Sequence, residues 1–143
     1  MPMATTRIST AHWEGALLDG AGQVSLNSSG LGTFDVTWAS RANDPEGRTS
    51  PEELIGAAHA SCYSMAFSNA LAQADTPPRS VDTTASVTFQ PGEGITGIHL
   101  DVVADIPGIS EEDFQRIAED AKTNCPVSQA LKATNITLKA TLH

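Results

Sequence analysis

Basic residues are scarce in this sequence of 143 residues: eight Lys and Arg stand against 17 Asp and Glu, which gives a formal net charge of −9. Proteins that bind nucleic acid need basic patches opposite the phosphates, so we expect no nucleic-acid partner. The negative charge also argues against binding to an anionic membrane surface. The sequence has no run of 18 apolar residues, so we expect no membrane partner and no membrane span.

Cysteine is equally rare, because the chain contains only Cys62 and Cys125. Two cysteines do not make the disulfide framework of a small secreted protein. Residues 1–7 lack the apolar segment that directs secretion. We therefore expect a cytoplasmic location, where an isolated pair of cysteines is either inert or redox-active.

The length favours one domain over residues 1–143. The sequence patterns predict the order βββ-α-ββ-αα-β, which is an α+β fold with largely antiparallel sheets packed on a long central helix. Strands are expected over residues 6–14, 23–27, 34–38, 81–89, 95–106 and 135–142, and helices over residues 51–74, 110–123 and 126–132.

The long central helix is the clearest of these elements. Pro51 suits its first position, and the only charges from there to its end are Glu52 and Glu53, with Asp75 just beyond. A helix that is apolar or small nearly all round is expected to be buried on most faces. Its 24 or so residues span roughly 36 Å, which a chain this small cannot cover alone, so we expect a partner subunit.

Cys62 lies in the middle of this helix, on a stripe of apolar and small residues, and is first interpreted as a core side chain. Burial alone raises a thiol pKa, and a mid-helix thiol is far from the helix N-terminus that could lower it. A reactive Cys62 therefore needs a fixed cation. The candidates nearby in sequence are Arg41, Arg48 and His59, although His59 is better explained as a hydrogen-bonded core histidine.

Cys125 directly precedes Pro126 at a predicted helix start, where it suits the N-cap position. The positive end of that helix would favour its thiolate, and the alternative is a turn cysteine without chemistry. His59 and Cys62 offer two metal ligands at i, i+3 spacing, but no second pair has the spacing of a metal site. We expect neither a metal nor a cofactor.

Three segments together are similar to one protein family. They are AHWEG at residues 11–15, PEELIGAAHASC at residues 51–62 and NCPVSQALK at residues 124–132. In this order and spacing they resemble the osmotically induced protein C (OsmC) branch of the OsmC/Ohr family, and the resemblance covers nearly the whole chain. It implies a thiol-dependent peroxidase that reduces organic hydroperoxides and, more weakly, hydrogen peroxide.

The resemblance also implies roles for individual residues. Cys62 matches the peroxidatic cysteine, Cys125 the resolving cysteine that forms a disulfide with it, and Glu52 the glutamate that holds the active-site arginine. Arg41 matches that arginine, but no aromatic residue follows it and the loop is one residue longer than usual, so Arg48 is an alternative. The family further implies an intertwined homodimer with active sites at the interface, recycled by an external dithiol of the lipoyl type.

Geometry restricts the role of Glu52, because ten residues of straight helix separate it from Cys62 by about 15 Å. The helix could bend near Gly56, an arginine could bridge the gap, or Glu52 could serve Cys62 of the partner subunit, which we favour. An apolar wall of Met65, Phe67 and Ile55 would suit an alkyl or fatty-acyl tail. Two rival functions are a non-enzymatic redox sensor and a dimer that binds an apolar ligand.

Overall fold

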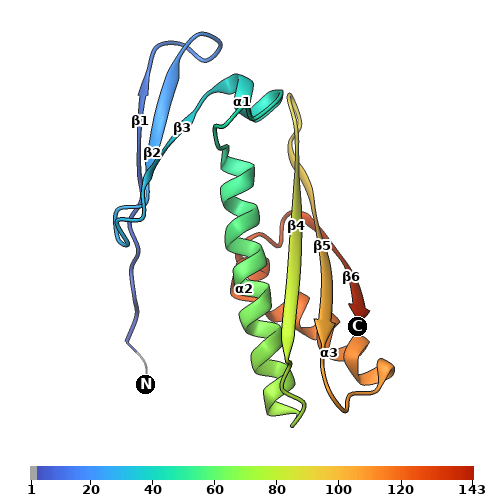
Figure 1. Cartoon of the computed structure of the whole chain (residues 1–143). Coiled ribbons are helices and arrows are strands. Elements are labelled where there is room, and N and C mark those ends of the chain that lie inside the picture. Colours follow the sequence, from blue (N-terminus) through green and yellow to red (C-terminus); the bar gives the residue numbers. More distant parts are fainter. Residues whose placement is uncertain (1–2) are drawn as a thin grey trace. The chain divides into compact units, whose positions relative to one another are not determined.

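The computed structural model describes residues 3–143 (Figure 1). The chain divides into two compact units, Met1–Pro51 and Glu52–His143, here called the N-terminal and C-terminal units. The expected order of elements is confirmed, with one short helix added before the long one. The α+β class is confirmed, whereas the single domain over residues 1–143 stays a prediction.

The N-terminal unit is a three-stranded antiparallel sheet followed by a short helix. Its elements are β1 (Thr10–Glu14), β2 (Ala21–Ser25), β3 (Thr33–Val36) and α1 (Trp38–Ala42), and the strands lie in the order β1-β2-β3. We expected the third strand to continue to Trp38. It ends earlier because Thr37 caps α1: the Thr37 hydroxyl accepts a hydrogen bond of 3.0 Å from the Ser40 backbone N–H.

No hydrophobic side chain of this unit is buried within residues 3–51. Ser40 is the one buried residue in that range. Large apolar side chains are instead exposed across the unit: Met3, Ile8, Trp13, Leu17, Leu18, Leu31 and Phe34. The sheet therefore has no hydrophobic core of its own.

The C-terminal unit combines a second sheet with three helices. Its elements are α2 (Pro51–Gln73, which starts at the unit boundary), β4 (Ser80–Gln90), β5 (Gly94–Asp105), α3 (Glu111–Asn124), α4 (Pro126–Ala130) and β6 (Asn135–Leu142). β4 pairs with β5 antiparallel, and β6 pairs with β5 parallel. The parallel pairing departs from the antiparallel pattern because β6 follows a crossover through α3 and α4.

α2 is one unbroken helix in Figure 1 and runs beside β4, with the Ser64 and Thr83 hydroxyls 2.7 Å apart. We had expected α2 to be buried on most faces, but it buries only one stripe. The stripe consists of Glu52, Gly56, His59, Tyr63, Phe67 and Leu71. Met65, on another side, is 69% exposed. The chain alone therefore leaves an apolar side of α2 in contact with water.

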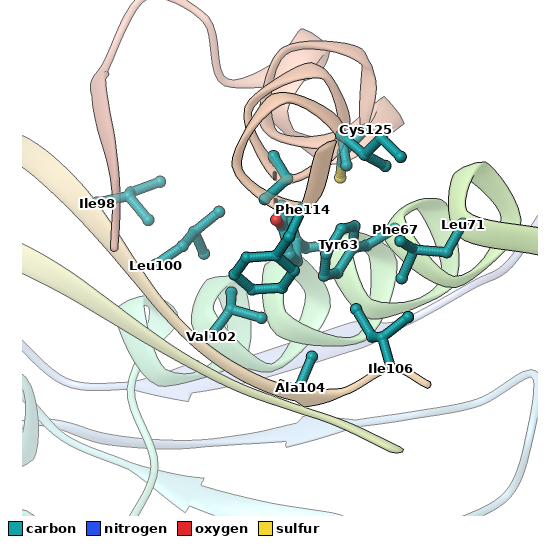
Figure 2. Close-up of a cluster of buried hydrophobic side chains, with 13 residues drawn as sticks. Tyr63, Phe67, Leu71, Ile98, Leu100, Val102, Ala104, Ile106, Phe114 and Cys125 are labelled. Atoms are coloured by element: carbon teal, nitrogen blue, oxygen red, sulfur yellow. Dashed lines mark hydrogen bonds between the residues drawn. The ribbon is translucent and has the colours of Figure 1, made fainter. Parts of the chain in front are cut away.

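The hydrophobic core lies between α2, the second sheet and α3 (Figure 2). The predicted apolar face of α3 is confirmed, since Phe114, Ile117, Ala118 and Ala121 are all buried. Two contacts join it to α2: the Phe67 and Phe114 ring centroids are 5.9 Å apart, and the Tyr63 hydroxyl donates to the Ala118 carbonyl at 2.9 Å. The packed helices hold the end of α3, and with it Cys125, against α2.

Candidate active site

The structure brings the two cysteines together within the C-terminal unit. Cys62, on α2, is partly buried, whereas Cys125, between α3 and α4, is 0% exposed and belongs to the core cluster of Figure 2. Both are free thiols, and the Cys62 side chain is hydrogen-bonded to that of Cys125. A disulfide needs sulfur atoms about 2.05 Å apart, so a small approach of the two elements would join them.

The surroundings of Cys62 within this unit disfavour its thiolate. Burial raises the pKa of the Cys62 thiol, and the hydrogen bond and charge of Cys125 raise it further. One group acts in the opposite direction, because a hydrogen bond to the Val127 backbone lowers the same pKa. The balance leaves the pKa of Cys62 raised, so activation at neutral pH requires a further positive group.

The start of α4 contacts Cys62, whereas the sequence indicated either a thiolate at Cys125 favoured by this helix start or a turn cysteine without chemistry. Cys125 does occupy the N-cap position of α4, as predicted, but its side chain makes no capping hydrogen bond. The backbone of Val127, in the first turn of α4, is hydrogen-bonded to Cys62 instead. The donor at this helix start therefore favours the charge on the other cysteine.

His59 is a core residue, as expected, and its surroundings disfavour the charged form. It is 0% exposed, its Nε2 lies 2.7 Å from the Ser128 hydroxyl oxygen, and its Nδ1 has no hydrogen-bond partner among the described residues. Burial lowers the pKa of His59. A neutral imidazole cannot supply the positive charge that a Cys62 thiolate needs, which removes His59 from the three cation candidates.

Cys62 opens onto a groove of about 570 Å³ between α2 and the end of α3. The groove is lined by Cys62, Met65, Ala66, Asn69, Ala70, Gln73, Asp120, Ala121, Asn124 and Pro126. Met65 therefore belongs to the apolar wall, as predicted. Phe67 does not, because it is 0% exposed in the core, and Ile55 does not line the groove. An apolar groove beside a thiol suits a small molecule with an alkyl or aryl part.

Neither of the two candidate arginines lines this groove, and nor does the predicted glutamate. Glu52 is in the first turn of α2 and is 7% exposed. Arg41 is a half-buried residue in the last turn of α1, and Arg48 is exposed in the loop that follows. Both arginines belong to the N-terminal unit, so the C-terminal unit holds the thiols and the glutamate without either candidate cation.

The sequence interpretation missed two residues that contact the site, Val127 and Ser128. Ser128 is three residues after Cys125, and His59 is three residues before Cys62. This equal spacing, along one predicted helix and from the predicted N-cap of another, was a signal that could have paired them. The hydrogen bond from the Val127 backbone could not be found this way, because it does not depend on a side chain.

Two other features limit the kinds of site that the described chain offers. Within residues 3–143 no group of three or more His, Cys, Asp and Glu side chains is placed to hold a metal ion. None of the helices in that range has the length and apolar character needed to cross a bilayer.

Comparison with known proteins gives consistent matches. The family model for OsmC-like protein matches residues 43–140. Peroxiredoxin OsmC of Escherichia coli (strain K12) is 47% identical over 126 residues, which cover 86% of this chain and 87% of that protein.

Solved structures agree with the fold. An organic hydroperoxide resistance protein from Elizabethkingia anophelis is similar with a TM-score of 0.69 and 28% identity, covering 99% of this chain and 98% of that one. An OsmC-like protein from Vibrio cholerae has a TM-score of 0.73 at 17% identity, covering 96% of this chain and 99% of its own, and shows the fold alone.

Proposed function

This chain belongs to the OsmC-like protein family and is a peroxidase, and on that premise we propose that it reduces organic hydroperoxides with Cys62 as the attacking thiol. One observation carries the proposal: Cys62 lines an apolar groove while its thiol is hydrogen-bonded to a second, fully buried thiol. A peroxide can reach the first sulfur, and the second sulfur is already beside it.

The difference in exposure between the two cysteines supports the roles that we propose for them. Cys62 is partly buried and lines the groove, so a substrate in the groove meets its sulfur. Cys125 is fully buried and does not line the groove, so it acts only after Cys62 has been oxidised. This difference supports Cys62 as the peroxidatic cysteine and Cys125 as the resolving cysteine of the proposed cycle.

The chemistry uses two thiols and no cofactor. The Cys62 thiolate attacks the terminal oxygen of the hydroperoxide, the O–O bond breaks, and the alcohol leaves with one proton, which converts Cys62 to a sulfenic acid. The Cys125 sulfur then bonds to the Cys62 sulfur, and the sulfenic oxygen leaves as water. An external dithiol, of the lipoyl type, restores both thiols by exchange and becomes a disulfide itself.

The groove explains why an organic hydroperoxide would be preferred to hydrogen peroxide. Met65, Ala66 and Ala70 present apolar surface next to Cys62. Covering this surface with an alkyl or aryl group makes the free energy of substrate binding more favourable. Hydrogen peroxide has no such group. The expected result is a lower KM for cumene hydroperoxide than for hydrogen peroxide.

Arg41 is the arginine that we propose for thiolate stabilisation. Its half-buried position distinguishes it from Arg48, which is exposed. A guanidinium offers planar donors that can stabilise a thiolate and orient peroxide oxygens together. Glu52, 7% exposed at the start of α2, would hold that guanidinium, because a buried carboxylate requires a positive or hydrogen-bonding partner.

A homodimer is part of the proposal. The exposed apolar side chains of the N-terminal unit and the exposed Met65 side of α2 both need a covering surface. Ten residues of unbroken helix keep Glu52 about 15 Å from Cys62 on the same chain, which favours a site completed by Glu52 of the partner subunit. Light scattering should give twice the chain mass of 14.9 kDa, and a mass of one chain would contradict this part.

Steady-state turnover tests the function. Reduced protein receives excess cumene hydroperoxide and dihydrolipoamide, and dithiol oxidation is followed over many turnovers. The wild type should turn over repeatedly, and Cys62→Ser should be inactive. Unchanged activity in Cys62→Ser would contradict the proposal. A single oxidation without turnover would indicate a redox sensor, and binding without oxidation would indicate an apolar-ligand protein.

A further inference from the structure

Two buried contacts join α2 to the segment that begins α4, and only one of them involves sulfur. The first is the contact between the Cys62 and Cys125 thiols. The second joins His59 Nε2 to the Ser128 hydroxyl at 2.7 Å. His59 and Cys62 are three positions apart within α2, which places them side by side on one helix face. Ser128 is three residues after Cys125, the N-cap residue of α4. The imidazole–hydroxyl contact therefore lies next to the thiol pair.

Ser128 is well placed to fix α4 against α2. Of the five described residues of α4, Ser128 alone is buried, at 4% exposure. Val127 and Leu131 pack against the core beside it, and the Ser128 hydroxyl adds a directed polar contact to this apolar packing. The same short segment carries the Cys125 thiol and the Val127 backbone group that bind Cys62. Any displacement of Ser128 would consequently move both groups relative to the Cys62 sulfur.

A buried histidine at position 59 stabilises the core less than an apolar side chain would. His59 is fully buried, and its Nδ1 makes no hydrogen bond to any described residue. An unpaired buried polar atom lowers stability, so an apolar side chain of similar size would pack at lower cost. A buried polar pair can instead fix the register of two elements. The Nε2 contact with Ser128 is a pair of this kind.

We propose that His59 and Ser128 form a positioning pair that holds α4 in the place from which Cys125 can attack oxidised Cys62. The pair acts on the second chemical step, and this inference rests on the peroxidase cycle proposed above. In that step the S–O bond of the Cys62 sulfenic acid breaks, the S–S bond to Cys125 forms, and the Cys125 thiol proton leaves with the oxygen as water. Neither His59 nor Ser128 exchanges electrons or leaves the core.

Rapid-quench measurement of the two steps tests the pair. Reduced protein is mixed with one equivalent of cumene hydroperoxide, and samples quenched with dimedone are analysed by mass spectrometry for sulfenic acid and for the internal disulfide. In Ser128→Ala, disulfide formation should slow roughly ten-fold, the equivalent of one lost hydrogen bond. Oxidation of Cys62 itself should stay within about three-fold of the wild type, and the dimedone adduct should accumulate.

Two further variants separate positioning from a general loss of stability. Ser128→Thr keeps the hydroxyl and should restore the rate of disulfide formation to near that of the wild type. Ser64→Ala removes a comparable hydroxyl, 2.7 Å from Thr83 on β4, without touching the thiol pair. It should leave disulfide formation unchanged. The inference is overturned if Ser128→Ala forms the disulfide at the wild-type rate, if Ser64→Ala slows it equally, or if both steps slow together in Ser128→Ala.

Failure of the inference can be distinguished from failure of the proposed function. If wild-type Cys62 is not oxidised by the hydroperoxide, the function is wrong, and the pair is then tested with diamide. Diamide is an azo oxidant that accepts two electrons and two protons as a thiol pair becomes a disulfide. Slower disulfide closure in Ser128→Ala than in Ser128→Thr would still support the positioning pair, and equal closure rates would overturn it.

Discussion

The N-terminal and C-terminal units of this chain differ in what each one lacks. The C-terminal unit contains both thiols and the whole buried hydrophobic core of residues 3–143. The N-terminal unit contains both candidate arginines, Arg41 and Arg48, and seven of the nine large hydrophobic side chains that are exposed in the described chain. One unit has the nucleophile without its cation, and the other has the cations without a core.

Each unit by itself therefore leaves one requirement of the proposed function unmet. The surroundings of Cys62 in its own unit raise its pKa, although attack on a peroxide needs the thiolate. The apolar side chains of the first sheet stay in contact with water unless another surface covers them. A homodimer that brings Arg41 to Cys62 would correct both deficits at once.

The largest expected effect concerns the core that only the C-terminal unit has. Phe67→Ala removes a fully buried ring that packs against Tyr63 and Phe114, and should lower the free energy of unfolding by about 3–5 kcal/mol. Phe34→Ala, at a ring that is 42% exposed in the first sheet, is expected to lower it by less than 1.5 kcal/mol. Guanidinium unfolding at one fixed protein concentration measures both values.

A Phe34→Ala cost as large as that of Phe67→Ala would remove the contrast between the two units. It would mean that Phe34 is buried in solution, either in a core of the first sheet or against a partner subunit. Repeating both measurements at a lower protein concentration provides the control, because a surface covered by a partner contributes less stability as the dimer dissociates. The Phe67→Ala difference from the wild type should not change on dilution.

A somewhat smaller effect is expected when the proposed cation, Arg41, is removed. Arg41→Ala should lower kcat/KM for cumene hydroperoxide roughly 100-fold, since removing a fixed donor from developing negative charge has effects of that order. Arg48→Ala is the matched control, because Arg48 is the exposed alternative in the loop that follows α1. It should stay within about three-fold of the wild type. A large loss in Arg48→Ala with normal activity in Arg41→Ala would reverse the assignment.

The smallest effect is a pH dependence of stability that comes from His59. Burial lowers the pKa of His59 in the folded chain, so below its ordinary value of 6.5 the unfolded chain binds more protons than the folded one. The contribution of His59 to the free energy of unfolding is therefore fully present above that pH. It falls as the pH is lowered, by at most about 1.4 kcal/mol per pH unit. Guanidinium unfolding near pH 7.5 and near pH 5.5 measures the loss.

His59→Gln separates this contribution from those of the other three histidines. Because glutamine does not titrate, the variant should lose less stability than the wild type over the same pH interval. Parallel losses in both proteins would show that the imidazole of His59 is not buried in its neutral form.

The sequence predicted the elements of the fold well where a local pattern determined them. The apolar spacing of α3, from Phe114 to Ala121, and the Pro51 start of α2 both appear in the structure as expected. The end of β3 was missed because the Thr37 cap competes with strand propensity at a single residue. The parallel pairing of β6 with β5 was missed because strand order depends on tertiary packing.

The sequence predicted which cysteines form the candidate site, but it predicted their burial and contacts only in part. Cys62 and Cys125 were identified as a pair, and the structure places them in contact. The sequence did not reveal which thiol is more buried: Cys125 is fully buried, whereas Cys62 lines the groove. That outcome depends on how α3 packs on α2, and the Val127 contact depends on backbone placement, which residue identity does not reveal.

The most direct test of the account is the pKa of Cys62 in the intact protein. The rate of Cys62 alkylation by iodoacetamide, followed on its own peptide by mass spectrometry, is measured against pH for the wild type and for Arg41→Ala. If Arg41 completes the site, the wild-type midpoint lies below the ordinary thiol value of about 8.5, and Arg41→Ala moves it above that value. A wild-type midpoint above about 8.5, unchanged in Arg41→Ala, would contradict the account.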